Sequence, residues 1–292
     1  MPAIPIPYCS LEDIRAFRDI GPAETADDNL LEGFAIKASA LWERLCRGRK
    51  FYPTYETRYF DHPQGDGSVL ALIDADLLEV DAFTTNNGAV AVTADQYYPM
   101  CGDRYDLTPF NRLVMKSDSS QPNLLYSGTP QKANAVTGWW GYHNDWANAF
   151  VGSGDALAAQ VTTTGTTLTV SSAAGADLYG VMPRFKVQGL LKIGTEYLYV
   201  TDKASNSLTV VRGVNGTTAA AHSTAADVYV YRPIEAVRHA ATRLAVWMYQ
   251  QRSSPVESDR PILIGDGTTL LPTRLPKDVT EIAAAYVRRS YR

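Results

Sequence analysis

The apolar residues of this chain change their spacing twice, and this constrains the fold more than any single motif does. Over residues 28–47, Leu, Phe, Ala and Trp side chains recur at the spacing of one helix face. From Phe51 the period becomes two, which is typical of half-buried strands. The helical spacing returns after Pro233. The sequence therefore predicts helices toward both ends of the chain and β-structure between them.

Two helices are predicted before the β-region. The first covers residues 10–20, because Ser10 and Asp13 are spaced as a capping box and a Gly-Pro pair follows the last apolar residue. The second covers 28–47 and ends where Gly48 is suited to a left-handed C-terminal cap. Both segments carry an apolar stripe that must be buried against another element.

Two further helices are predicted in residues 233–292. Pro233 is suited to the first turn of the helix that begins this segment. The last helix follows Pro276, with Asp278 and Glu281 spaced as a capping pair. Because each helix has one apolar face, the N-terminal and C-terminal pairs are expected to pack together.

Strands are predicted from Phe51 to about residue 115, where aromatic and aliphatic side chains alternate with polar ones. Asn87-Gly88 predicts a hairpin turn within this region. Residues 117–137 are rich in Ser, Gln, Asn, Pro and Gly, so we expect a long loop there.

Residues 151–232 differ in composition from the rest of the chain. They are rich in Thr, Val, Ala and Gly and hold only 6 basic and 5 acidic side chains. Short strand patterns alternate with turns, which is typical of a small barrel or sandwich. This stretch is therefore predicted to be a separate β-module.

These elements together predict an α+β fold. A helical core with a few β-strands is expected, interrupted by a small inserted all-β domain. Residues 1–150 form the first part of the core, 151–232 the inserted domain, and 233–292 the second part with two helices.

The charge balance argues against a dedicated nucleic-acid binder. The 27 Lys and Arg residues against 31 Asp and Glu give a net charge of −4, without the basic footprint of such proteins. The charge is unevenly distributed, because residues 61–116 hold 3 basic and 9 acidic side chains and residues 233–292 hold 9 and 6. Different partners are expected for the two regions.

The three cysteines, Cys9, Cys46 and Cys101, are widely spaced and odd in number. They predict neither a disulfide framework nor a thiolate metal site, and they favour a reducing compartment. The N-terminal sequence lacks the basic and apolar regions of a signal peptide, and no apolar stretch approaches membrane-spanning length. We expect neither secretion nor a membrane span.

No catalytic or metal-binding constellation is predicted. The histidines lack any close ligand spacing; they are His62, His143, His222 and His239. An acidic cluster is interpreted as the solvent face of a strand in preference to a cation site; its members are Asp74, Asp76, Glu79 and Asp81. No nucleotide-binding fingerprint occurs. The sequence thus predicts a protein that is not an enzyme and has no cofactor, with a dispersed Cys/His hydrolase as an alternative.

The segment Gly138–Trp146, GWWGYHNDW, has the most unusual local composition. Its aromatic residues lie beside the start of the β-module; they are Trp139, Trp140, Tyr142 and Trp146. We expect them to pin the inserted domain or to anchor a protein–protein contact. Stacking of a sugar or a base on these rings is an alternative.

Two groups of motifs are similar to known proteins. SLEDIRAFRDIG, DDNLLEGFAIKASALWERLCRGRKFYPTYETRYFD and LLEVDAFTTNNGAVAVTADQYYP, with the helix at 234–252, resemble head–tail connector proteins of tailed bacteriophages, also called head-completion or neck-adaptor proteins. IGTEYLYVTD and LTVVRGVNGTTAAAHSTAADVYVY resemble a β-module that recurs in phage structural proteins. The second resemblance rests on Gly213, Gly216, Thr217 and His222.

The connector resemblance implies a structural virion protein at the neck, assembled in the host cytoplasm. Such a subunit would form a homo-oligomeric ring of about twelve copies below the portal. The ring would bind the portal and the next neck or tail protein, and DNA would pass through its channel without sequence specificity. The resemblance places no residue in a catalytic role.

The resemblance further implies a role for the C-terminal helix, Asp278–Arg292, in docking to the portal. The predicted contacts are apolar residues Val279, Ile282 and Tyr286 and basic residues Arg288, Arg289 and Arg292. The alternative is that this helix packs on its own subunit. The alternative function is a carbohydrate- or receptor-binding virion protein that uses the Trp139–Trp146 cluster together with the β-module.

Overall fold

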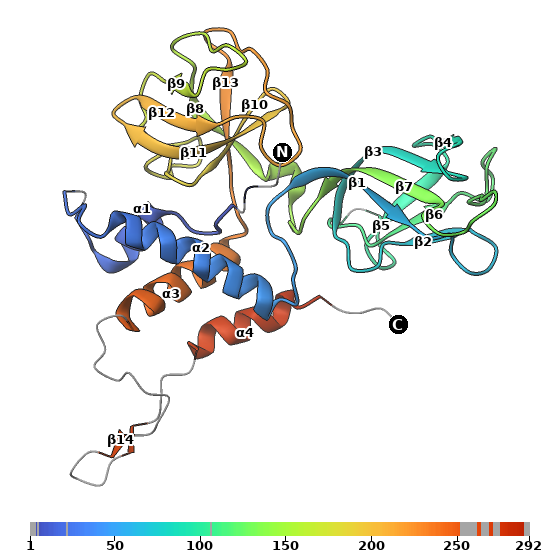
Figure 1. The fold of residues 1–292 in the computed structure, drawn as a ribbon, viewed down its shortest axis with the longest axis horizontal. Coiled ribbons are helices and arrows are strands. Elements are labelled where there is room, and N and C mark those ends of the chain that lie inside the picture. The colour runs from blue at the N-terminus through green and yellow to red at the C-terminus, as the bar shows by residue number, and fades with distance from the viewer. Residues whose placement is uncertain are drawn as a thin grey trace.

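The computed structural model describes residues 4, 6–21, 23–105, 107–251, 262–263, 269–270 and 275–288. Within these residues the chain forms a group of helices and two β-lobes (Figure 1). The helices come from the two ends of the chain, and both β-lobes come from the sequence between the second and third helices. We call them the helical base, the first lobe (residues 54–140) and the second lobe (residues 150–231).

The helical base holds the four helices of the described chain: α1 Leu11–Arg18, α2 Asp28–Leu45, α3 Glu235–Gln251 and α4 Lys277–Tyr286. Each lies within a segment where the apolar spacing predicts a helix. The capping box of α1 is confirmed, because the Ser10 hydroxyl accepts from the Asp13 amide and the Asp13 carboxylate accepts from the Ser10 amide. The capping pair predicted for α4 is wrong: no side chain caps this helix, and Asp278 pairs with Arg243 instead.

The first lobe consists of two antiparallel sheets. Its strands are β1 Thr54–Phe60, β2 Val69–Ala71, β3 Leu77–Thr85, β4 Val90–Val92, β5 Tyr97–Met100, β6 Arg112–Met115 and β7 Asn134–Trp140. The four-stranded sheet has the order β1-β7-β3-β4, and the three-stranded sheet has the order β2-β6-β5. Strand β7 pairs along its length with β1, placing Thr57 opposite Thr137, and on its other side with β3. Apolar side chains of the two sheets share one core.

The second lobe is a six-stranded antiparallel sheet preceded by a short 3-10 helix, η1 Trp146–Asn148. Its strands are β8 Phe150–Ala156, β9 Thr167–Thr169, β10 Leu190–Ile193, β11 Glu196–Ala204, β12 Ser207–Val211 and β13 Asp227–Tyr231, in the order β8-β13-β10-β11-β12-β9. One face has its own core, which includes Leu198 and Val228. Tyr197 and Tyr231 of the other face join the core of the helical base. A further pair, β14 Ile262–Leu263 and β15 Thr269–Leu270, lies between α3 and α4 in sequence.

The predicted fold class is wrong. The described chain is mostly β, with antiparallel sheets of four, three and six strands and only four α-helices, so a helical core with a few strands does not describe it. The prediction gave residues 51–140 too little β-structure. In particular, the predicted loop over residues 117–137 is wrong at its end, because residues 134–137 belong to β7, the strand that joins β1 to β3.

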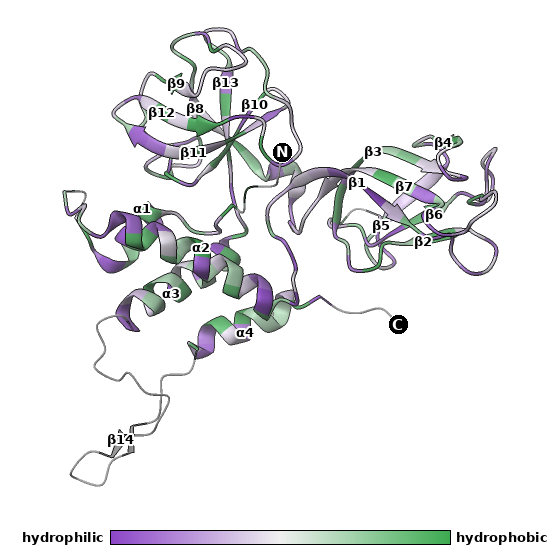
Figure 2. Cartoon of the chain, in the orientation of Figure 1, coloured by the Kyte–Doolittle hydropathy of each residue, from purple (hydrophilic) through white to green (hydrophobic). Residues whose placement is uncertain are grey.

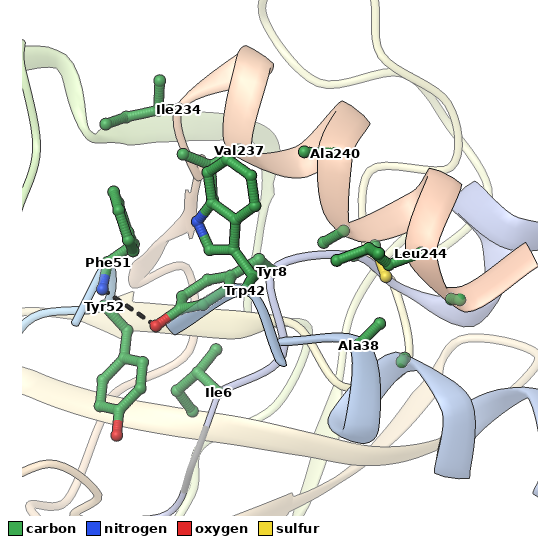
Figure 3. Packing of buried hydrophobic residues seen from close by; sticks show 14 of the residues in the cluster. Ile6, Tyr8, Ala38, Trp42, Phe51, Tyr52, Ile234, Val237, Ala240 and Leu244 are labelled. Atoms are coloured by element: carbon green, nitrogen blue, oxygen red, sulfur yellow. Dashed lines mark hydrogen bonds between the residues drawn. The ribbon is translucent and has the colours of Figure 1, made fainter. Parts of the chain in front are cut away.

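The core of the helical base draws on distant parts of the sequence. Trp42 of α2 is fully buried and packs near Phe51 and the α3 face that contains Val237 (Figure 3). The Tyr8 hydroxyl accepts from the Phe51 amide at 3.0 Å and donates to Glu43 at 2.7 Å. In Figure 2, α2 and α3 each carry both hydrophobic and hydrophilic residues, as amphipathic helices do. The apolar residues of these helices bind the two ends of the chain together.

The second lobe is also attached to the segment that leads from α2 into β1. The side-chain amide of Asn215 donates to the Pro53 carbonyl at 3.0 Å, and the Tyr55 amide donates to the Asn215 carbonyl at 2.8 Å. Gly216 lies so close that an added Cβ would stand 1.9 Å from the Tyr55 carbonyl oxygen. Asn215 is 1% exposed, so this contact is buried.

Replacing Gly216 with alanine is expected to lower the free energy of unfolding by about 2–4 kcal/mol. The added methyl group would collide with the Tyr55 carbonyl, and the φ of +89° at this position is unfavourable for alanine. Gly88→Ala is the matched control, because Gly88 has the same φ and a Cβ added there would meet nothing within 4 Å. Urea unfolding should show a loss of only about 1–2 kcal/mol for the control. Equal losses would contradict the close contact.

Candidate functional site

Aromatic side chains gather where the two β-lobes meet. Trp139 of β7 stacks on Tyr197 of β11, with ring centroids 4.4 Å apart and planes inclined by 19°. Phe150 of β8 lies 4.9 Å from the Tyr197 ring. Trp146 of η1 lies about equally far from the Trp139 and Phe150 rings, at 6.2 and 6.0 Å. These four rings form a continuous aromatic surface between the lobes.

This surface is hollowed into a pocket of about 330 Å³. The lining residues are Glu79, Trp139, Trp146, Ala147, Phe150, Lys192, Tyr197 and Tyr229. Tyr229 of β13 is 39% exposed and Tyr197 is buried, so the rings extend from the interior to the surface. Glu79 of β3 and Lys192 of β10 add one negative and one positive charge. We call this site the aromatic pocket.

The rim of the aromatic pocket is held in place by hydrogen bonds. The Trp146 indole N–H donates to Glu79 Oε2 at 3.2 Å. The side-chain amide of Asn148 donates to both carboxylate oxygens of Asp145 at 3.0 Å. These bonds link the last residue of η1 to the residue that precedes it. The Asp145 amide donates to His143 Nδ1 at 3.1 Å. Trp146 is therefore presented by an ordered turn, which lowers the entropy cost of binding.

Trp140 and Tyr142, also predicted as interface residues, lie elsewhere. Trp140 is 1% exposed within the core of the first lobe, and its indole N–H donates to the Glu56 carbonyl. Tyr142 packs against Phe51 and Tyr286 in the helical base. The structure thus brings two of the four predicted aromatic residues, Trp139 and Trp146, into the pocket.

Several pocket residues have no distinguishing pattern in the sequence. Phe150, Tyr197 and Tyr229 lie on three different strands, and Glu79 and Lys192 lie on two others. The one sequence pattern that bears on these residues is the alternation within DVYVY. It places Tyr229 and Tyr231 on the strand face opposite Val228 and Val230. This pattern assigns a face to each strand, but it does not show which strands meet.

The residues predicted to dock on the portal lie mostly against their own subunit. Val279 is fully buried, Ile282 packs on the core of the helical base, and Tyr286 lies 6.2 Å from the Trp42 ring. Arg288 donates to Asp76 at 3.1 Å. Arg289 and Arg292 lie outside the described residues.

The acidic residues interpreted as the solvent face of a strand do not all face solvent: Asp74, Glu79 and Asp81 are exposed, whereas Asp76 is buried. Asp76 is 7% exposed and accepts from both Arg49 and Arg288 at 3.1 Å. Glu79 lines the aromatic pocket, and Asp81 accepts from the Tyr55 hydroxyl. Among the described residues no group of three or more His, Cys, Asp or Glu side chains is arranged to hold a metal ion.

The cysteines are in surroundings that disfavour the reactive thiolate. Burial raises the pKa of the Cys9 thiol far above its usual value and that of the Cys46 thiol to about 12. Burial also raises the pKa of Cys101. All three therefore remain protonated at neutral pH, which does not suit a nucleophile.

His222 belongs to a buried ionic network in the second lobe. Glu196 is fully buried and binds Arg212 through two hydrogen bonds of 2.6 Å. Its Oε2 also lies 2.7 Å from His222 Nε2, and its oxygens accept from the amides of Gly213 and Ala220. These contacts outweigh the desolvation and lower the pKa of Glu196. The network includes Gly213 and His222, two of the four residues on which the β-module resemblance rests, and it has a structural role.

Two surface regions expose large apolar side chains. In the second lobe Leu178, Tyr179 and Met182 are 72%, 65% and 67% exposed. The Asp177 carboxylate fixes this loop, because it accepts from the amides of Tyr179 and Val181 and from Arg232. We call it the 177–182 loop.

In the first lobe Tyr98, Tyr105 and Leu107 are 45%, 58% and 39% exposed, and the two tyrosine rings lie 5.2 Å apart. We call this set the tyrosine patch. Gatherings of exposed apolar side chains are typical of protein–protein contact sites.

No protein-family model matches this chain, and no curated protein matches it. No helix among the described residues is both long and apolar enough to cross a membrane. The similarity to phage connectors therefore stays a prediction from the sequence motifs.

Proposed function

We propose that this protein is a structural virion subunit, a head–tail connector that forms a closed ring. The observation that carries this proposal is the pair of unlike apolar surfaces on different lobes, the 177–182 loop and the tyrosine patch. A ring repeats one head-to-tail contact, and such a contact joins two different surfaces of the same subunit. The loop of one copy then packs against the tyrosine patch of the next.

Charged side chains lie beside both surfaces. The first lobe is acidic, with 9 acidic and 3 basic side chains in residues 61–116. Asp103 is fully exposed in the turn that carries Tyr105, beside Arg112. Arg232 stands over the Tyr179 ring at 4.6 Å in the 177–182 loop. Arg112 pairs with Asp103 and Asp177 pairs with Arg232, and Lys116 lies 4.4 Å from the centre of the Tyr98 ring. The proposed contact between copies is therefore mainly apolar.

In this proposal about twelve copies form the ring below the portal of a phage head. The ring binds the portal and the next neck or tail protein, and DNA passes through its channel without sequence specificity. The subunit performs no catalysis and needs no cofactor. Support for this neck location comes from the motifs shared with connectors.

The portal contact is proposed at the C-terminal end of α4. Val279 and Tyr286 already contact their own subunit, so they are available to the portal only if α4 leaves the helical base. Arg288 ends the described part, and Arg289 and Arg292 follow it. We therefore propose that Arg288, Arg289 and Arg292 make the main contact with the portal, by binding acidic groups on its surface.

The ring contact is tested by replacing Tyr179 with serine. Because the ring is 65% exposed, the change should leave the unfolding temperature nearly unaltered but weaken self-association and portal-dependent assembly by about tenfold or more. Tyr59→Ser is the matched control, since Tyr59 is 61% exposed on β1 and belongs to neither surface. Light scattering of the purified proteins measures the masses. Assembly that is lost equally in both variants, or in neither, would contradict the assigned contact.

A further inference from the structure

The aromatic pocket has features that a ring contact does not explain. Its walls are aromatic rings from strands β7, β8, β11 and β13, and it lies between the lobes. Ring faces of this kind bind flat apolar surfaces by stacking. The pocket volume of about 330 Å³ is within the usual range for small-molecule sites.

The polar groups of the pocket limit the charge of an occupant. Glu79 offers carboxylate oxygens, one of which already accepts from Trp146. Lys192 offers ammonium donors, and its Nζ lies 5.4 Å from the centre of the Phe150 ring. The two charges balance each other, so neither a polyanion nor a cation is favoured.

Two charged ligand classes fit this chemistry poorly. A quaternary ammonium group would compete with Lys192 for the face of the Phe150 ring, and the positive charge of Lys192 would repel it. A nucleotide could stack its base on the rings, but its phosphates would meet only one cation and a nearby carboxylate. A neutral ligand with one apolar face and many hydroxyl groups is compatible with every group in the pocket.

We propose that the aromatic pocket binds a neutral saccharide. The C–H face of a sugar ring stacks on Trp146, the hydroxyl groups donate to Glu79, and Lys192 donates to the sugar oxygens. Tyr197 forms the floor, because it is 1% exposed and stacks on Trp139, whereas Tyr229 is 39% exposed. The ordered η1 turn holds Trp146 in place before binding. This inference does not depend on ring formation.

The test is calorimetric titration of the full-length protein with maltohexaose, cellohexaose and chitohexaose. At least one of these probes is expected to bind with a Kd below about 1 mM. Trp146→Ala should weaken that binding by about tenfold or more, and Trp146→Phe should restore part of it. Glu79→Gln should weaken binding less than Trp146→Ala, because the amide oxygen still accepts from a hydroxyl group.

Tyr59→Ala is the control for loss of an exposed aromatic residue, because Tyr59 is 61% exposed on β1 and lies in neither the aromatic pocket nor the two apolar surfaces. Its affinity for the saccharide should equal that of the unaltered protein. The proposal is overturned if none of the three probes binds, or if Trp146→Ala binds as tightly as the unaltered protein. Tighter binding of oligogalacturonate than of any neutral probe would also overturn it. Thermal unfolding of each variant shows that a loss of affinity is not a loss of fold.

Discussion

Replacing Glu196 with alanine is expected to lower the free energy of unfolding by about 3–5 kcal/mol. The change leaves Arg212, which is 6% exposed, without its carboxylate, and also removes the acceptor for His222 and for two backbone amides. A buried charge that loses its partner is far more costly than an exposed pair that is broken. Urea unfolding followed by far-UV circular dichroism measures the loss.

Asp202→Ala is the control for this variant. Asp202 lies on the same strand, β11, but is exposed to solvent. Its replacement should change the free energy of unfolding by less than about 0.5 kcal/mol. A Glu196 variant as stable as the Asp202 variant would show that the network does not stabilise the second lobe.

The same network makes stability depend on pH. The folded protein lowers the pKa of Glu196 below its ordinary value of 4.5. The stabilisation from the ionised carboxylate is therefore fully present above about pH 4.5 and is lost as the pH falls through the lower folded-state pKa. The free energy of unfolding of the unaltered protein, measured at decreasing pH, should show this loss. The Glu196→Ala variant should not show it.

Replacing Trp42 with alanine is expected to cost about 3–5 kcal/mol of unfolding free energy. Trp42 is fully buried in the helical base and packs near Phe51 and Tyr286, so the change leaves a cavity among α2, α3 and α4. Thermal or urea unfolding measures the effect. Because this core joins both ends of the chain, the variant should lose cooperativity between helices and lobes as well as stability.

Trp42→Phe separates the volume of the side chain from its polar atom. The Trp42 indole nitrogen is buried and has no hydrogen-bond partner among the described residues. Phenylalanine removes this unpaired donor and retains most of the aromatic volume, so its cost should be well below that of alanine. Similar losses for the two variants would contradict the view that packing volume is the main contribution of Trp42.

Local sequence patterns were sufficient to locate the helices. Their spacing, the Ser10–Asp13 capping box and the prolines before α3 and α4 are short-range signals, and each helix lies where they predict it. The sequence pattern predicts too few strands because β7 follows a long polar stretch and includes Gly138, and glycine is disfavoured in strands. Gly138 is required there by a close approach, since an added Cβ would lie 2.0 Å from the Glu79 carbonyl oxygen.

The aromatic pocket was only partly predictable for a related reason. Trp139 and Trp146 were visible as neighbours in an unusual segment, whereas Tyr197 and Tyr229 come from β11 and β13, far away in sequence. Strand patterns show which face a residue occupies, but the pairing of distant strands depends on the whole fold. The acidic residues near β3 show the same limit, because Asp76 meets Arg49 and Arg288 while Glu79 meets Trp146.

The central claim, that this chain is a ring-forming connector, is tested most directly by measuring its mass. Light scattering coupled to size-exclusion chromatography is applied to the protein alone and after mixing with purified portal. We predict either a ring of the protein alone or a monomer that joins the portal at a ratio near one subunit to one. A protein that stays monomeric at every concentration and does not bind the portal would contradict the connector function.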